Sequence, residues 1–197
     1  MNKKKRICIV FIIIIVLVLI GVSSIIVMKH LRTNDIRENA KSTIDCIINS
    51  DYSKDFYYIS MYGQVKNELN MGEVANSVMS NMKYKLNNIT IDTADDGTDF
   101  AIIKCEIKNV DMQDILYQFQ NADYEYNEEN LNLMLDKINS KNFKTKTFNI
   151  DIVMMKIGND WYLYETPDFN DAITGGLYSL YTDMENSILN ELTKENN

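Results

Sequence analysis

The chain has 197 residues, of which 46% are hydrophobic, and a formal net charge of −8 at pH 7. This length and apolar content allow one domain with a sizeable core and an additional segment. The charge is unevenly distributed, because residues 33–197 contain all 28 acidic residues and 14 of the 20 basic ones, a net of −14. Such an acidic domain repels phosphate backbones, so no nucleic acid is expected as a partner.

The N-terminus combines a basic tail, residues 1–6, with an uncharged apolar run over residues 7–28. A helix of about 20 apolar residues crosses the hydrocarbon core of a bilayer. We therefore predict a transmembrane helix over 7–28 that anchors the protein in the membrane. The positive-inside rule predicts a single-pass protein of the cell membrane, with a cytoplasmic N-terminus and residues 29–197 in an extracytoplasmic domain.

A cleaved signal peptide is the alternative to this anchor. Small residues at 21–24 would suit a peptidase, but the apolar run continues beyond them to Met28. An uncleaved signal-anchor is therefore favoured, and a secreted protein stays open.

The extracytoplasmic domain begins with two predicted amphipathic helices. The first covers residues 34–49, with Asn34 as its N-cap, and the second covers 65–82. The aromatic stretch 51–62 lies between them, and we interpret it as a short helix.

The hydrophobic period then changes from that of a helix to that of a strand. Strands are predicted over 84–93 and 100–108, joined through an Asp-Gly turn at Gly97. The second strand alternates well. Its apolar residues are Ala101, Ile103, Cys105 and Ile107, and Lys104, Glu106 and Lys108 point the other way, with Ile102 as the one apolar exception. This pattern is typical of a half-buried antiparallel hairpin.

Two short helices, over 111–119 and 131–138, are predicted between this hairpin and a second one. The second hairpin pairs 144–157 with 161–165 around Gly158. Pro167 is expected to end its last strand, and Asp168 or Asn170 to cap a final helical region. The resulting fold class is α+β, with helices packed on a curved antiparallel sheet.

The second hairpin carries a family resemblance through Lys156, Gly158, Asp160 and Trp161. A strand that ends in a lysine and a glycine turn, followed by a tryptophan strand, resembles the closing hairpin of nuclear-transport-factor-2-like (cystatin-like) domains. The membrane- or lipid-anchored bacterial members are the most similar. The resemblance covers about residues 34–176, and a C-terminal helix over 177–193 is extra. It implies a cone-shaped pocket between helices and sheet, which in the enzymes of the family holds an acid–base pair.

Little of that chemistry is available in this chain. The one histidine, His30, lies at the predicted membrane boundary, which removes histidine general-base catalysis from the domain. Asp92 and Asp151 lie in strands opposite the apolar faces, so we interpret them as solvent-facing. The loop from Asp92 to Gly97 resembles a calcium loop only faintly, because Ala94 and Ile103 occupy ligand positions. We predict no catalytic, cofactor-binding or metal-binding residues.

Two further features bear on function. Cys46 and Cys105 would pair if the chain is exported, although their apolar surroundings favour buried free thiols. Twelve tyrosines are present, and exposed tyrosine clusters are enriched at protein interfaces, although amphipathic tyrosines that rim a core or pocket are the favoured interpretation.

We therefore expect a non-catalytic module that binds a protein partner at the cell surface or a small ligand. The alternatives are an enzyme of the same fold that uses pocket carboxylates, and a secreted protein after signal cleavage. Convergent carboxylates in a pocket would favour the enzyme, whereas a filled pocket beside an exposed apolar patch would favour the interaction module.

Overall fold

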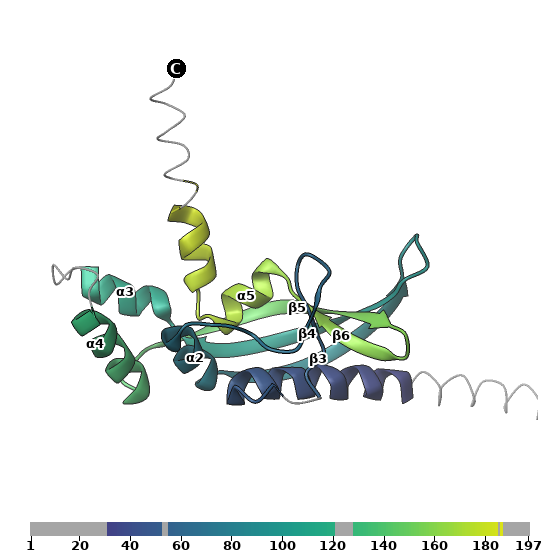
Figure 1. The fold of residues 1–197 in the computed structure, drawn as a ribbon, viewed down its shortest axis with the longest axis horizontal. Coiled ribbons are helices and arrows are strands. Elements are labelled where there is room, and N and C mark those ends of the chain that lie inside the picture. The colour runs from purple at the N-terminus through teal and green to yellow at the C-terminus, as the bar shows by residue number, and fades with distance from the viewer. Residues whose placement is uncertain (1–30, 53–54, 121–127, 185, 187–197) are drawn as a thin grey trace, which may run out of the picture. The chain divides into compact units, whose positions relative to one another are not determined.

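The structure is a computed structural model that describes residues 31–52, 55–120, 128–184 and 186 (Figure 1). It divides into two compact units, residues 1–38 and 39–197. The chain is helical over 31–49. Asn34 therefore lies within the helix, and the prediction that it is the N-cap is wrong.

We predicted that the fold begins with a membrane-spanning helix and that the protein is single-pass and signal-anchored. The structure contradicts this prediction. Within the described residues, no helix is both long enough and apolar enough to cross a membrane. Residues 7–28, on which the prediction and its signal-peptide alternative depend, lie outside the described part of the chain.

A six-stranded sheet is the centre of the second unit. Its spatial order is β2-β1-β6-β5-β4-β3. The strands are β1 (Tyr58–Ile59), β2 (Val65–Lys66), β3 (Lys83–Thr93), β4 (Asp99–Val110), β5 (Thr145–Ile157) and β6 (Asp160–Tyr164). The predicted α+β class is confirmed, but the prediction of an antiparallel sheet is wrong, because β1 runs parallel to β6.

The region of β1 and β2 differs most from the predicted elements. We expected a short helix over 51–62, and the structure has β1 there, with Tyr58 opposite Leu163 of β6. Tyr58 is 1% exposed. The Oγ1 atom of Thr43 bonds both the N–H and the carbonyl of Tyr57 at 3.1 Å. Burial of a large aromatic side chain stabilises the strand more than local helix propensity disfavours it.

The predicted helix over 65–82 is too long. Residues Val65–Lys66 form β2, and the helix α2 covers only Glu73–Ser80. Gly72 is its N-cap in an extended conformation, which separates α2 from the preceding loop.

A β-bulge explains how β3 places its apolar residues. Leu86 lies opposite Cys105 and Ile89 lies opposite Ile103, so three steps along β3 match two along β4. The extra residue brings Leu86 and Ile89 to the same face although their spacing is odd. Both predicted hairpins are confirmed, β3 with β4 and β5 with β6.

The two inserted helices are also confirmed, as α3 (Met112–Gln120) and α4 (Glu128–Asn139). They lie together beyond one end of the sheet (Figure 1). A second core joins them to α2 and to the end of β4; its buried members are Val78, Val110, Met112, Ile115 and Ile138.

The last described helices are α5 (Pro167–Ile173) and a helix over 177–184. The predicted caps Asp168 and Asn170 are wrong. Thr166 is the N-cap, since its Oγ1 accepts a hydrogen bond from the Phe169 N–H at 3.2 Å. Pro167 occupies the first turn, where its missing N–H costs nothing, so it begins the helix as well as ending the strand.

The sheet has an inner face covered by helices and an outer face. On the inner face the buried side chains are Ala101, Ile103, Cys105 and Ile107 of β4, Phe148, Ile152 and Met154 of β5, and Trp161 and Leu163 of β6.

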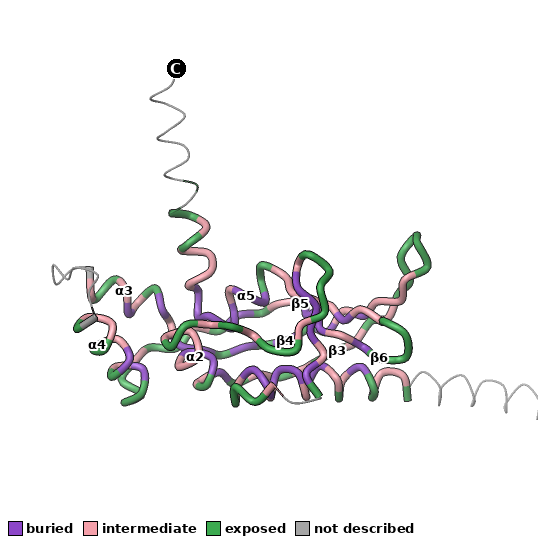
Figure 2. The backbone as a smooth tube through the Cα atoms, in the orientation of Figure 1, coloured by how far each residue is buried: buried purple, intermediate pink, exposed green. Residues whose placement is uncertain are grey.

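Hydrogen bonds also join the helices to the sheet. Asn109 donates from Nδ2 to the carbonyls of Ala172 and Ile173 in α5, at 3.0 and 2.8 Å. Tyr84 donates to Asp45 Oδ1 of the first helix at 2.7 Å. Figure 2 shows the buried positions following the central strands and α5, whereas the β3–β4 turn is exposed.

Candidate functional site

The two strand carboxylates considered from sequence are solvent-facing, as predicted. Asp92 is exposed on β3. Asp151 lies on the outer face, where its side chain is 45% exposed and its Oδ2 is 2.7 Å from Lys104 Nζ. His30 lies outside the described residues.

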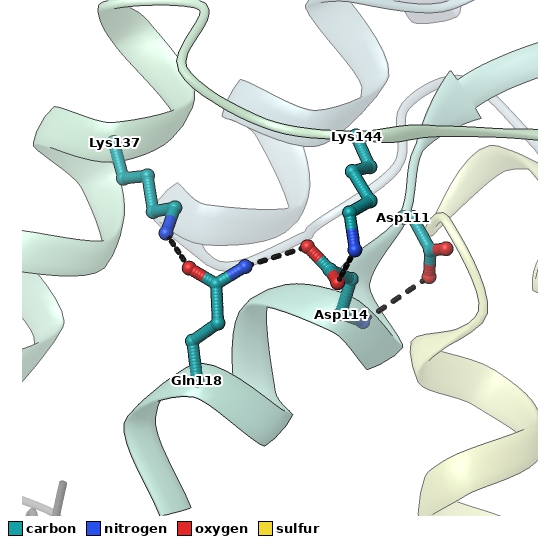
Figure 3. Close-up of polar contacts among 5 residues, drawn as sticks. All are labelled: Asp111, Asp114, Gln118, Lys137 and Lys144. Atoms are coloured by element: carbon teal, nitrogen blue, oxygen red, sulfur yellow. Dashed lines mark hydrogen bonds and ion pairs between the residues drawn. The ribbon is translucent and has the colours of Figure 1, made fainter. Parts of the chain in front are cut away.

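A polar cluster joins α3, α4 and the residue that precedes β5 (Figure 3). Asp111 caps α3, because its Oδ1 accepts from the Asp114 N–H at 3.2 Å. Asp114 accepts from Lys144 Nζ at 2.6 Å through Oδ1 and from Gln118 Nε2 at 2.6 Å through Oδ2. Lys137 in turn donates to Gln118 Oε1. The network thus links α3 to Lys144 through the Asp114 carboxylate and to α4 through the Gln118 amide.

The electrostatics of this cluster suit a structural role. The hydrogen bond and charge of Lys144 lower the pKa of Asp114, and Asp114 raises the pKa of Lys144. A general base needs a pKa near the working pH and a free lone pair for its substrate. Because Asp114 is held ionised and each of its oxygens already accepts a hydrogen bond from a neighbouring side chain, we interpret the cluster as a structural link between α3, α4 and Lys144.

A second carboxylate, Glu165, lies beside α5. Its Oε1 accepts from Asn170 Nδ2 at 2.7 Å, and its Oε2 accepts from the Met61 N–H at 3.1 Å. Glu165 therefore ties the β1–β2 loop to α5. Sequence analysis placed this residue only at the end of a strand, because neither partner is near it in a recognisable motif.

Two buried polar atoms near Glu165 have no hydrogen-bond partner among the described residues. They are the hydroxyl of Tyr58 and Oδ1 of Asn170. Burial and then the charge of Glu165 raise the pKa of Tyr58 far above its ordinary value, so the phenol stays protonated. Buried polar groups of this kind commonly bond an ordered internal water.

Two cysteines lie outside the N-terminal segment. Cys46 and Cys105 are both buried, and no disulfide joins them. Burial raises the pKa of Cys105 to about 12, so its reactive thiolate form is suppressed at neutral pH.

Metal-ligating side chains do not converge in the part of the chain that the structure describes, where no group of three or more could hold an ion. The segment from Asp92 to Gly97 that resembles a calcium loop covers the end of β3 and most of the β3–β4 turn. Asp96 uses its Oδ1 to accept from the Thr98 N–H at 2.9 Å, which is a local turn contact.

The outer face carries an apolar surface at one end. Two cross-strand rows form it: Phe100, Met155 and Tyr162 in one, and Ile102, Val153 and Tyr164 in the next. All six side chains are half-buried, so solvent reaches each of them. Tyr57 extends the first row, since its ring lies 5.4 Å from that of Tyr162 in an edge-to-face contact. We call the six row residues the apolar half of the outer face.

The other end of the same face is charged and rich in lysine. Beyond Ile102 the outward residues of β4 are Lys104, Glu106 and Lys108, which lie opposite Asp151, Asn149 and Thr147 of β5. On the other side of β4, Lys83 lies opposite Lys108 and Lys85 opposite Glu106. We call Lys83, Lys85, Lys104, Glu106, Lys108 and Asp151 the basic half.

Only fragments of this surface are visible in the sequence. Ile102 is an exception to the alternation of its strand, and the tyrosines suit either an interface or the rim of a core. A signal was present, because residues 152–155 and 161–164 are continuous apolar runs, which place apolar side chains on both faces of a strand.

The chain matches no family model, no curated protein and no solved structure. The residues that carry the resemblance to nuclear-transport-factor-2-like domains lie in the β5–β6 hairpin, where Gly158 turns with a φ of 62° and Trp161 is 3% exposed. Membership of that family stays a prediction.

Proposed function

We propose that this protein is a non-catalytic module that binds another protein through the apolar half of its outer face. The observation that carries the proposal is the pair of apolar rows across β4, β5 and β6, which are partly exposed on a face opposite the core. Contiguous exposed apolar surface of this kind is typical of interaction sites.

The placement of the carboxylates supports binding over catalysis. Asp114 and Asp151 are paired with lysines, and Glu165 is hydrogen-bonded through both oxygens. The inner face, where the family resemblance implies a pocket, is lined by buried apolar side chains of β4, β5 and β6. These features match the interaction module among the alternatives that the sequence leaves open.

The apolar half suits a contact of modest strength. Full burial of one large apolar side chain contributes about 1.5–3 kcal/mol, and these six are already half-buried. Covering the remainder contributes on the order of several kcal/mol, from which the entropy of association is subtracted. We therefore expect reversible binding. That the domain lies outside the cell stays a prediction, which rests on the basic tail and the apolar run of residues 1–32.

The test is site-specific photo-crosslinking of the full chain in the cells that produce it. A photoreactive phenylalanine analogue replaces Tyr162 in the apolar half or, as the matched control, Tyr117, which is 66% exposed on α3. We expect one discrete crosslinked product from position 162 and none from position 117. Val153→Asp should remove that product while leaving the circular dichroism spectrum unchanged. Equal crosslinking at both positions, or none at 162, would contradict the proposal.

A further inference from the structure

We propose that the partner bound by the outer face is a protein segment that presents acidic side chains beside apolar ones. The inference rests on the proposed function and specifies the chemistry of the partner. It follows from the lysines that lie next to the apolar half, which outnumber the carboxylates beside them.

The basic half stands out against the charge of the rest of the domain. Residues 33–197 have 28 acidic and 14 basic residues, yet four lysines gather here around Glu106 and Asp151. Lys104 is the one paired with a carboxylate, Asp151, at 2.7 Å. Among the described residues, Lys83, Lys85 and Lys108 form no ion pair.

The cross-strand pair of Lys83 and Lys108 is unfavourable in the free protein. The two residues are directly opposite each other in the β3–β4 ladder, and like charges so placed destabilise a sheet. A carboxylate placed between the two ammonium groups would turn this repulsion into two favourable contacts. The pair therefore gains more from an anionic partner than an isolated lysine does.

The two halves are continuous, so a single segment contacts both. Ile102 and Lys104 are neighbours on the same face of β4, and their partners Val153 and Asp151 are neighbours on β5. From Phe100 to Lys108 the strand extends about 26 Å. A helix of about 18 residues has that length, so one amphipathic helix could lie along the whole surface.

Other occupants fit this surface less well. A second copy that packs face to face through a two-fold axis presents the same apolar rows and the same basic half, in which four lysines outnumber the carboxylates of Glu106 and Asp151, so its charge is not complementary. An anionic membrane or nucleic acid matches the basic half, but the acidity of residues 33–197 opposes approach to any extended polyanion.

The experiment selects binders for the purified full chain from a displayed library of random peptides of about 18 residues. We expect enriched peptides to combine Asp or Glu with Leu, Ile, Phe or Trp. Their affinity, measured by fluorescence anisotropy, should fall about tenfold for the double variant Lys83→Glu/Lys108→Glu. It should also weaken when NaCl rises from about 0.05 M to about 0.5 M.

The matched control is Lys41→Glu/Lys141→Glu, which changes the net charge equally at two exposed lysines outside the outer face. It should leave binding unchanged. The double variant at 83 and 108 keeps like charges opposed, so its folding should equal that of the parent.

The outcomes separate the two proposals. The enriched peptides could be apolar or basic, and lose affinity for the Met155→Asp variant but not for Lys83→Glu/Lys108→Glu. That result would overturn this inference and leave the proposed function standing. Peptides insensitive to both variants, or no enrichment, would overturn both. Two further results would overturn the assignment of a protein segment as partner. One is self-association, measured by sedimentation, that the lysine reversal abolishes. The other is binding to anionic vesicles without any selectivity among peptides.

Discussion

A Cβ atom at Gly175 would lie 2.3 Å from the carbonyl oxygen of Val110, closer than any side chain can approach. The backbone contact is reinforced by the Met112 N–H, which donates to the Gly175 carbonyl at 3.0 Å. The turn after α5 is therefore pressed against the junction of β4 and α3. Only glycine fits there, both because φ is +65° and because a side chain has no space.

This contact predicts unequal effects of two glycine substitutions. Gly158 has nearly the same backbone angle, φ +62°, but nothing lies within 4 Å of its Cβ position. Gly158→Ala should lower the free energy of unfolding by about 1 kcal/mol, the cost of a left-handed residue. Gly175→Ala adds a clash with a strand backbone and should cost about 3 kcal/mol or more. Urea unfolding measures both, and equal losses would show that the clash is relieved by a small shift.

The unpartnered hydroxyl of Tyr58 leads to a second prediction. An unsatisfied buried polar group costs about 1–3 kcal/mol, so Tyr58→Phe should leave stability unchanged or raise it by up to about 1 kcal/mol. Tyr84→Phe is the matched control, because it removes the hydrogen bond to Asp45 and should cost about 1 kcal/mol. A loss at position 58 as large as that at position 84 would mean that the Tyr58 hydroxyl bonds an ordered water.

The Asp114–Lys144 pair should make stability depend on pH at both ends of the range. The lowered pKa of Asp114 gives a contribution that is present above the ordinary value of about 3.9 and is lost as pH falls through the lowered pKa. The raised pKa of Lys144 gives a contribution that is present below about 10.4 and is lost as pH rises through the raised pKa.

The Asp114→Asn variant tests this prediction. It should unfold at lower urea than the parent at neutral pH, and the two midpoints should converge as pH falls through the lowered pKa of Asp114. Asp151→Asn, which removes the more exposed pair with Lys104, should differ little from the parent at any pH. A difference for Asp114→Asn that persists undiminished in acid would point to lost packing in place of lost charge.

Cys105 should be unreactive in the folded protein. Its pKa is raised to about 12 by burial, so alkylation at about pH 8 should leave it unmodified in native buffer and modify it quickly in urea. Because the folded state disfavours the thiolate, this thiol also makes the domain less stable as pH rises above about 8.5. Site-resolved mass spectrometry measures the labelling. Fast native labelling of Cys105 would show that β4 opens locally.

Much of the fold could be predicted from local pattern. The alternation in β4 and β5 and the short apolar stripes of α3 and α4 are properties of contiguous residues, so their burial follows once a core forms. Gly158 and Gly97 likewise mark turns through their positive φ. The predicted α+β class and both hairpins rest on such local signals.

The elements that could not be predicted depend on distant partners. Tyr58 joins a strand because β6 offers a free edge, and nothing in residues 51–62 records that edge. The β3 bulge exists because Leu86 and Ile89 must both reach the core over β4. Thr166 replaces the expected caps because only Glu165 and Thr166 separate β6 from α5, so the carbonyl and hydroxyl of Thr166 meet the first turn of the helix.

The candidate site also depends on contacts between residues far apart in the chain, so it could not be predicted from local pattern. Apolar runs in β5 and β6 are visible in the sequence, but only the register sets Val153 between Ile102 and Tyr164, and Lys83 against Lys108. A shift of one residue would move each of these side chains to the opposite face. Composition and periodicity therefore determined which residues form strands and helices, whereas the pairing of strands far apart in the chain decided which side chains share a surface.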